Sequence, residues 1–369
     1  MNSTANDRHE HLIDLITLGE IDGIGVKRMH LLIEALGSAS AVLGATIGEL
    51  SDLPHIGRET ASNIHEKQNR KKAVKTAEQI SQRGWKYFLY PDTDYPESLK
   101  HIPDPPPYLF YAGNYTDRDS NAIAVVGSRS ASEEGRIFAE SLAADLSGNG
   151  ITVISGMARG VDTAAHRGAL TAGGRTIAVF GCSLDIIYPP EGKKLFYQII
   201  ESGCVFSEFL PGTPPDRPHF PRRNRLISGL SQGVVVIEAA LRSGALSTAG
   251  HALIQNREVF AVPGSPRQQT SMGTNRLIKE GATLLISVED IYSELPRLKG
   301  RVNVTRVENI PDITDTEKKV VGLFDEGPIH IDRISRSLNL AVPELMQILL
   351  ALELKGIIRE LSGKRYILN

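Results

Sequence analysis

Seven short apolar runs between residues 121 and 296 constrain the fold of this chain more than any other feature. The runs are AIAVVG, ITVISG, RTIAVFG, CVFSE, VVVIEA, EVFAVPG and ATLLIS, and helix-like stretches separate them. Continuous apolar runs of this length are typical of parallel strands buried on both faces, with helices as the crossover connections. The sequence therefore predicts a doubly wound α/β domain, whose ligands bind at the carboxyl ends of the strands.

The segment before this domain divides into two parts. Residues 1–85 read as short helices with two similar turns, IDGIGVKR and LPHIGRET, which resemble a tandem helix-hairpin-helix unit (SAM-like). The backbone N–H groups of such a turn either hold a phosphate at a helix N-terminus or serve structure alone, and the second turn has only one glycine, Gly57. From residue 86 the chain is rich in proline, and YLFYAGN predicts an added edge strand. We assign 86–296 to the α/β domain.

The C-terminal part predicts a linker at 297–316 and a winged helix at 317–369, because three helical stretches precede the hairpin pattern IIRELSGKRYIL. The presumed recognition helix, VPELMQILLALELKG, carries Glu344 and Glu353 and only one basic residue, Lys355. A helix that reads duplex DNA presents basic or amide side chains. Protein contact or dimer support therefore fits this helix at least as well as DNA binding.

Composition excludes several classes of protein. The chain has 369 residues, 41% of them hydrophobic, and a formal net charge of -2, so any nucleic-acid binding must be focal. No apolar run is long enough to span a bilayer, and the N-terminus lacks the order of a signal peptide. The only cysteines, Cys182 and Cys204, cannot form a disulfide scaffold or a four-ligand metal site and are expected to be buried. We expect a cytoplasmic protein without a metal or membrane association.

The first predicted strand ends in VVGSRSASEEG, where Gly127, Ser128 and Arg129 begin the loop. This differs from G-x-G-x-x-G, and the second strand does not end in the acidic residue that would hold a ribose, so NAD binding is not expected. A Gly-Ser turn before a helix still offers N–H groups and a hydroxyl to a phosphate, with an arginine beside it. No G-x-x-x-x-G-K-[ST] motif occurs, so we propose no ATPase activity.

The second strand is followed by SGMARGVDTAAH, in which Ser155, Gly156 and Arg159 are candidate anion contacts. Asp162 and His166 lie four residues apart and share a helix face, as a catalytic or metal-binding pair would. The simpler interpretation is that Asp162 caps the helix and that His166 packs or bonds locally. After the third strand, Tyr188 either stacks on a base or covers the sheet edge.

The segment FPRRNRLISGLS places three arginines just before a buried strand. In a helix, Arg223 and Arg225 would lie about 200° apart, whereas in an extended segment both would face one groove. We predict an extended or irregular backbone here, with the helix starting afterwards. The alternative is an ion pair between one of them and Glu208 or Glu238. A small-residue run then opens the next helix. The full candidate set is Gly127, Ser128, Arg129, Ser155, Gly156, Arg159, Arg222, Arg223, Asn224, Arg225, Ser243, Gly244, Ser247 and Thr248.

These motifs, in this order, resemble the DprA/Smf family of DNA-processing proteins. The similarity includes GSR, SGMARGVDTAAH, GCSLDIIYP, SEFLPGTPP, FPRRNRLISGLS, VVVIEAALRSGALSTA and VFAVPGSPRQQTSMGTNRLIKEGA. The resemblance implies an extended Rossmann fold, a homodimer, single-stranded DNA binding, and loading of RecA past single-stranded-DNA-binding protein during natural transformation. It also implies DNA contacts for Arg129, Arg223, Asn224 and Arg225, with Arg222 at a variable position, and no catalytic residue or cofactor.

An enzyme is the competing interpretation, because the domain also distantly resembles phosphoribohydrolases that cleave nucleoside monophosphates. Their loop has the form P-G-G-x-G-T-x-x-E, whereas RSGALSTAGHA lacks the paired glycines and the final glutamate. We therefore expect no enzymatic turnover, although a bound nucleotide stays open. For the homodimer, Leu277 and Ile278 are candidate surface residues that can equally belong to the core.

Overall fold

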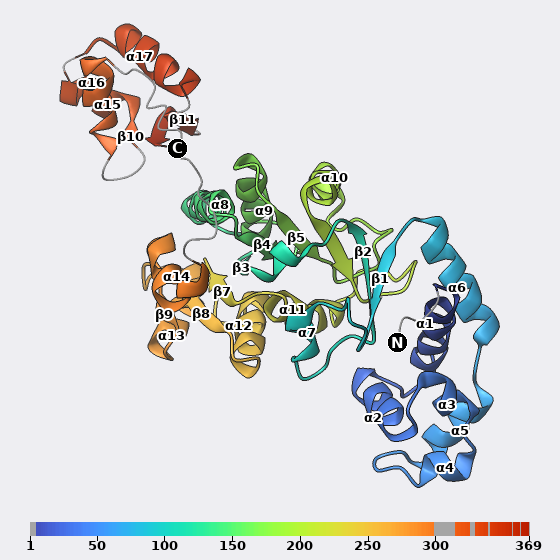
Figure 1. The fold of residues 1–369 in the computed structure, drawn as a ribbon. Helices are drawn as coiled ribbons and strands as arrows, with labels where there is room; N and C mark the ends of the chain where they lie inside the picture. Colours follow the sequence, from blue (N-terminus) through green and yellow to red (C-terminus); the bar gives the residue numbers. More distant parts are fainter. Residues whose placement is uncertain are drawn as a thin grey trace. The chain divides into compact units, whose positions relative to one another are not determined.

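The structure is a computed structural model that describes residues 5–298, 314–324, 329–338, 340–355, 357–361 and 363–368. The chain forms two compact units, Met1–Asn303 and Val304–Asn369, each with a hydrophobic core of its own (Figure 1). The predicted linker at 297–316 falls largely outside the described residues. The first unit contains the predicted sheet and the N-terminal helices, and the second contains the predicted winged helix.

The first unit is built on one mixed sheet of nine strands, with the order β1-β2-β6-β5-β4-β3-β7-β8-β9. All pairings from β6 through β3 to β9 are parallel, and β1 and β2 are antiparallel additions. The strands are β1 (Lys86–Leu89), β2 (Tyr108–Gly113), β3 (Ala122–Val126), β4 (Thr152–Ser155), β5 (Thr176–Val179), β6 (Cys204–Ser207), β7 (Gly233–Val236), β8 (Glu258–Ala261) and β9 (Thr283–Leu284). The doubly wound α/β fold predicted from the apolar runs is confirmed.

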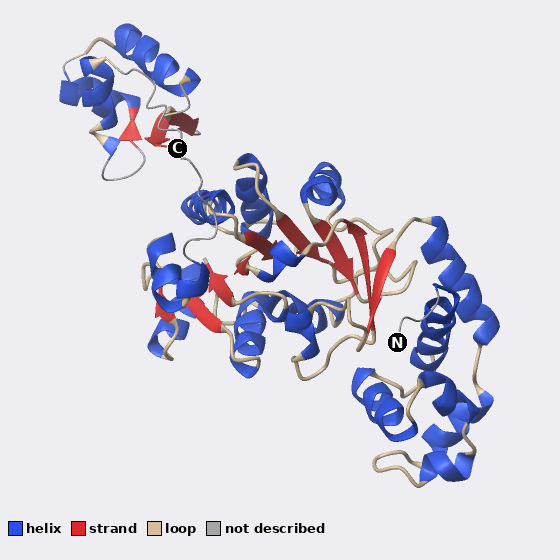
Figure 2. Cartoon of the chain, viewed as in Figure 1, coloured by secondary structure: helices blue, strands red, loops and turns tan. Residues whose placement is uncertain are grey.

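Helices cover both faces of the sheet, as Figures 1 and 2 show. On one face, α8 and α9 pack on β3, β4 and β7, and on the other α11 and α12 do so, which gives two separate cores. The helices of this part are α7 (Glu97–Lys100), α8 (Glu133–Gly148), α9 (Val161–Thr171), α10 (Lys193–Ser202), α11 (His219–Gly229), α12 (Gly244–Ile254), α13 (Met272–Lys279) and α14 (Val288–Glu294). Short 3-10 turns lie at Asp117–Ser120, Pro190–Gly192, Gln269–Ser271 and Pro296–Leu298.

Two details of this sheet differ from expectation. Tyr108–Gly113 is not an edge strand, because it bonds β6 on one side and β1 on the other. The four-residue β1 is too short to stand out in the sequence, and it takes the edge. Leu277 is 9% exposed and belongs to a core cluster, against which the half-buried Ile278 packs, so Leu277 cannot supply a dimer surface. Cys182 and Cys204 are both buried and unpaired, as expected.

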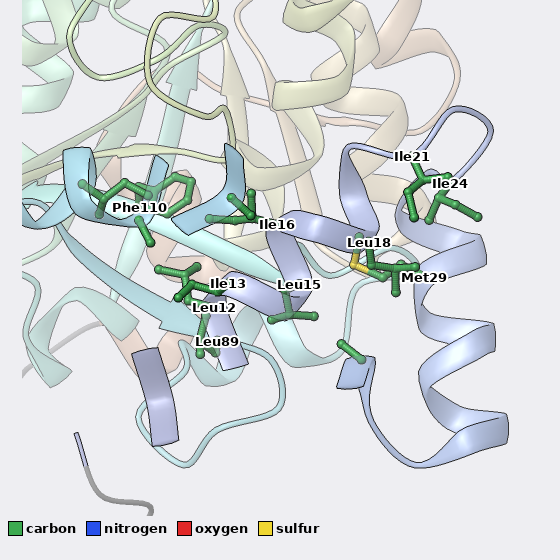
Figure 3. Packing of buried hydrophobic residues seen from close by; sticks show 14 of the residues in the cluster. Leu12, Ile13, Leu15, Ile16, Leu18, Ile21, Ile24, Met29, Leu89 and Phe110 are labelled. Atoms are coloured by element: carbon green, nitrogen blue, oxygen red, sulfur yellow. The ribbon is translucent and has the colours of Figure 1, made fainter. Parts of the chain in front are cut away.

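The N-terminal helices join the same unit. They are α1 (Ala5–Gly19), α2 (Val26–Leu36), α3 (Ala39–Gly44), α4 (Ile47–Ser51), α5 (Arg58–Glu66) and α6 (Arg70–Gln82). Leucine and isoleucine side chains of α1 share one core with Leu89 of β1 and Phe110 of β2 (Figure 3). Arg8 of α1 also donates to the backbone of Tyr87 and pairs with Asp94.

Two turns in this helical part have matching geometry. Gly23 and His55 both have positive φ, 86° and 64°, so His55 adopts the left-handed conformation that glycine supplies in the first turn. Gly25 and Gly57 are then the N-cap residues of α2 and α5, and neither cap is made by a side chain. The repeat read from the sequence therefore persists in the backbone, although the second turn has fewer glycines.

The second unit has the winged-helix order. Its elements are α15 (Asp315–Val321), β10 (Ile329–His330), α16 (Ile331–Leu338), α17 (Val342–Leu354), β11 (Ile358–Leu361) and β12 (Arg365–Leu368), and β12 lies between β10 and β11. The presumed recognition helix α17 exposes an apolar row consisting of Val342, Met346, Leu350 and Leu354. In the described part, no single helix could cross a membrane, and only the bent pair α16 with α17 reaches the required length and composition jointly.

Candidate nucleic-acid interface

A cavity of about 850 Å³ lies at the carboxyl ends of the parallel strands. Strand β3 is flanked by β4 and β7, so the strand order reverses there, and ligands of such sheets bind at this point. The loop after the first strand, Gly127 to Arg129, and the small-residue run that begins at Ser243 meet in this cavity. Eight members of the candidate set line it: Gly127, Ser128, Arg129, Arg223, Asn224, Ser243, Gly244 and Thr248.

Glycines in these loops are required by close approach rather than by a ligand. A Cβ atom on Gly127 would lie 2.6 Å from Val161 Cγ2. Gly160 has a φ of 76°, and its Cβ would meet the carbonyl oxygen of Ser128 at 2.2 Å. The loops after β3 and β4 therefore pack directly on each other, which holds the backbone around Arg129 in place.

Arg129 is exposed at the cavity and lies over the ring of Phe220, with 5.0 Å between the guanidinium carbon and the ring centroid. Phe220 also contacts Tyr188 at a centroid distance of 5.8 Å, and Arg223 lies 6.0 Å from its ring. The guanidinium of Arg129 is thus oriented by an aromatic face and still available to an anion. An exposed arginine beside two aromatic rings suits a phosphate with an adjoining base or sugar.

Arg223 lies within α11, so the prediction of an extended backbone at 223–225 is wrong. Its side chain is 4% exposed and donates from Nη1 to the carbonyl oxygens of Gly156, at 3.0 Å, and of Val179. Burial lowers the pKa of Arg223 to about 10, which leaves it charged at neutral pH. A Cβ atom on Gly156 would lie 2.6 Å from the guanidinium, which explains the glycine there. Arg223 therefore ties the ends of β4 and β5 together.

Arg225 points away from the cavity, as the helical geometry requires. It is 7% exposed, and its Nη2 donates to Glu208 Oε2 at 2.5 Å. Arg222 donates to the same oxygen at 3.0 Å but keeps about half of its side chain exposed. The ion pair considered in the sequence is therefore present at Glu208. Glu238 instead accepts from the backbone N–H and hydroxyl of Ser132.

Asn224 connects α11 to the start of α12, because its Nδ2 donates to the carbonyl oxygen of Gly244 at 3.2 Å. Gly244 is the first residue of α12, and Ser243 is its N-cap. The N-terminal amides of an eleven-residue helix favour an anion through their partial positive charge. Asn224 thus positions this N-terminus at the cavity wall.

The other predicted residues do not line the cavity. The Ser155 hydroxyl is buried and donates to the carbonyl oxygen of Val125 at 2.7 Å. The exposed Arg159 pairs with Glu191. Ser247 is half-buried on α12, one residue before the buried Thr248 that does line the cavity.

Asp162 and His166 are not a catalytic or metal-binding pair in this structure: Asp162 caps a loop and His166 bonds locally, as the simpler interpretation of the sequence had it. Asp162 accepts from the backbone N–H groups of Gly156, at 3.1 Å, and Ala158, at 3.2 Å, and burial raises its pKa. It caps the loop before α9, although the N-cap residue itself is Gly160. His166 is fully buried, bonds Thr176 Oγ1 through Nδ1 at 2.7 Å, and has its pKa lowered by burial to about 3. In the described residues, no cluster of His, Cys, Asp or Glu could hold a metal.

The lining residues outside the candidate set include Arg217, Phe220 and Arg242, which could contact a ligand. Arg217 and Arg242 are exposed and follow β6 and β7, so their positions after predicted strands are the signal that could have found them. With Arg129 and Arg223 they make four arginines in the lining, against two carboxylates, Asp162 and Asp216. The cavity is therefore electropositive although the chain as a whole is slightly acidic.

Comparison with known proteins gives two family matches. The model of the family DNA recombination-mediator protein A matches residues 86–296, and that of the DprA winged helix domain matches residues 305–364. Protein Smf of Synechocystis is 32% identical over 385 residues, covering 94% of this chain and 96% of that protein. The DNA processing protein DprA of Streptococcus pneumoniae is 45% identical over 207 residues, covering 56% of this chain and 73% of that protein.

Solved structures agree with these matches. The DNA processing protein A of Streptococcus pneumoniae superposes with a TM-score of 0.61 at 35% identity, covering 80% of this chain and 99% of that one. That of Helicobacter pylori, solved for its single-stranded DNA binding mode, gives 0.52 at 29% identity, covering 58% of this chain and 96% of that one. With both the α/β region and the winged helix matched, the chain belongs to the DNA recombination-mediator protein A family, the DprA/Smf DNA-processing proteins.

Proposed function

We propose that this protein binds single-stranded DNA in the cavity at the carboxyl ends of the strands. The observation that carries the proposal is the convergence of four arginines, an aromatic pair and the N-terminus of α12 on one cavity. Family membership supports it, as does the single-stranded DNA binding mode of the Helicobacter pylori relative. As further parts of this proposal, the protein acts in the cytoplasm, protects incoming strands and loads RecA onto them, past single-stranded-DNA-binding protein, during natural transformation.

In this proposal the cavity residues have different tasks. Arg129, Arg217 and Arg242 are exposed and contact phosphates, and a guanidinium does so as a planar fork. The amide at Gly244, at the N-terminus of α12, receives another phosphate. Phe220 offers its ring to a base, which any sequence satisfies. Arg223 and Asn224 act mainly by holding the cavity walls, since both are more than nine-tenths buried.

Salt dependence tests the phosphate contacts. The affinity for an oligothymidine is expected to fall with a log–log slope of about 0.7 per phosphate contact, so about 2 to 3 for the three or four contacts proposed. Fluorescence anisotropy at several salt concentrations measures the slope. An affinity that does not change with salt would remove the phosphate-binding proposal.

We also propose that the protein is not an enzyme. Of the two carboxylates in the cavity lining, Asp162 accepts from two backbone N–H groups, and Asp216 accepts from the N–H of Arg217. Neither is presented as a free general acid or base. Incubation with AMP, followed by an assay for released adenine, tests this. Release that depends on Asp162 or Asp216 would contradict it.

A homodimer is the remaining part of the proposal. With Leu277 in the core, its surface must be sought elsewhere, and Met272, Leu284 and Ile286 are exposed around the outer strand β9. Ile286 alone is 69% exposed. Exposed apolar side chains beside an open sheet edge are typical of an interface between copies.

Ile286→Asp is therefore expected to convert the dimer to a monomer in light scattering, because a buried unpaired carboxylate would be costly at the interface. Leu253→Asp is the matched control, since Leu253 is 63% exposed on another element, α12. A dimer that survives the first substitution but not the second would place the interface on α12.

The apolar row on α17 suits a protein contact rather than duplex DNA.

A further inference from the structure

Helix α17 carries two apolar faces, and only one of them is used in folding. The inner face packs on the core of the second unit through side chains that are at most 1% exposed: Leu345, Leu349 and Leu352. The outer face has an apolar side chain at every fourth position, and these are Val342, Met346, Leu350 and Leu354. Their exposed fractions are 40%, 50%, 57% and 81%. We call these four residues the α17 row.

The charges around the α17 row do not suit DNA or a membrane surface. The charged side chains on this helix are Glu344, which is exposed, and Glu353, which is half-buried and accepts from the backbone N–H of Glu360. Lys355, directly after the helix, donates to Glu317 at 2.7 Å. A helix that reads DNA or lies on an anionic bilayer carries basic residues beside its contact face. The row therefore suits a partner surface that is apolar and almost uncharged, like the row itself.

The spacing of the row makes it complementary to a second copy of itself. Side chains four residues apart form a ridge on a helix, and two such ridges pack together when the helices cross at about 50°. Two identical ridges can meet in this way about a two-fold axis, which buries the same patch on both copies. The axis would pass between Met346 and Leu350, at the middle of the row.

The size of the row decides when such a pairing forms. A stable interface buries about 600 Å² or more of each partner. Four side chains with exposed fractions of 40–81% supply less than this, so the contact is too small to join two free molecules. Copies that are already joined elsewhere meet at an effective concentration of about millimolar, at which a small contact forms.

We propose that α17 binds α17 of a second copy of this chain, and that the winged helix thereby strengthens the homodimer. The inference rests on the homodimer proposed above, which supplies the tether, and it adds a contact made by the second unit, Val304–Asn369. It assigns the presumed recognition helix to assembly rather than to DNA. Each contact raises the effective concentration for the other, so the loss of either one favours dissociation of the dimer.

A cysteine at the centre of the row tests the pairing in the full-length protein. The natural Cys182 and Cys204 are 2% and 0% exposed, so an added surface cysteine is the thiol that a maleimide reaches in the folded protein. Leu350→Cys is expected to give mostly covalent dimer with a short bis-maleimide, as seen on a denaturing gel. Ser337→Cys, at an exposed position of α16, is the matched control and should stay mainly monomeric on the gel. Equal cross-linking of the two variants would overturn the inference.

Leu350→Glu measures what the pairing contributes. It places two carboxylates at the two-fold axis, and the dissociation constant of the dimer is expected to rise at least about 10-fold, because the avidity of the second contact is lost. Light scattering on dilution measures the constant. Ser337→Glu adds the same charge to α16 and should stay within about twofold of the parent. Both positions are exposed, and circular dichroism checks that both variants fold. A constant that Leu350→Glu leaves unchanged would overturn the inference.

The outcomes separate this inference from the proposed homodimer. If the parent is a dimer in light scattering and Leu350→Cys does not cross-link, the homodimer stands and the α17 pairing fails. If the parent is a monomer and no cross-link forms, both fail. Adding Ile286→Asp should reduce cross-linking through Leu350→Cys, and undiminished cross-linking of a variant that is monomeric in light scattering would overturn the role of the tether. Flotation of the parent with phosphatidylglycerol vesicles that Leu350→Glu abolishes would assign the row to a membrane and overturn the pairing.

Discussion

Arg129→Ala is expected to weaken the binding of single-stranded DNA about 10- to 100-fold, the largest effect of any single cavity substitution. The guanidinium is exposed and lies over Phe220, so it is available to a phosphate of the strand. Its removal deletes a charge-assisted hydrogen bond to that phosphate, worth about 1.5–3 kcal/mol. Fluorescence anisotropy with a labelled oligothymidine measures the loss. Thermal unfolding should stay unchanged, because Arg129 has little burial to lose.

Two further variants make this result specific. Arg129→Lys keeps the charge but not the planar fork, so an intermediate loss is expected. Arg297→Ala removes another exposed arginine, which lies in the turn Pro296–Leu298 and does not line the cavity, and should bind like the parent. If Arg129→Ala and Arg297→Ala lower the affinity by similar factors, the arginines act as a diffuse field rather than as a site.

Arg225→Met is expected to lower the free energy of unfolding by about 3 kcal/mol, the largest effect on stability. The substitution removes a buried partner of Glu208 and leaves the carboxylate inside the protein with Arg222 alone. Breaking a buried ion pair from one side costs about 3–5 kcal/mol, and the remaining arginine moderates the loss. Urea unfolding followed by circular dichroism measures it.

Arg222→Met is the matched control, because Arg222 donates to the same oxygen of Glu208 from a half-exposed position. Water still reaches the guanidinium of Arg222, and the buried carboxylate keeps Arg225 as its partner, so the loss of stability should be smaller than for Arg225→Met. Equal destabilisation by the two variants would show that burial does not decide their contributions. A stable Arg225→Met protein with strongly reduced DNA binding would instead make Arg225 a direct DNA contact.

Substitution of both Arg223 and Arg225 by lysine therefore tests the bonds that these side chains make within the protein rather than a direct contact with phosphates. Arg223 holds the carbonyl oxygens of Gly156 and Val179, and Arg225 holds Glu208. A lysine cannot reproduce these fixed directions, so the double variant should lose stability first and DNA affinity as a consequence. The interpretation of FPRRNR as the part of the site that holds DNA stays a prediction, which this double variant tests against the bonds that the two side chains make within the protein.

The sequence by itself determined the sheet and its loops. Continuous apolar runs require burial on both faces, and this is a local property that the order of residues displays directly. The same runs also predict which loops lie together, because the carboxyl ends of parallel strands all lie at one edge of the sheet. For that reason Gly127, Arg129, Ser243 and Gly244 could be placed at one cavity, and the winged helix could be recognised from its element order.

Only the tertiary structure decided which arginines are free. Arg223 binds Gly156, 67 residues earlier, and Arg225 binds Glu208, 17 residues earlier, whereas Arg129 lies exposed over Phe220. An arginine's charge is visible in the sequence, but its availability depends on desolvation and on acceptors that folding brings from distant positions.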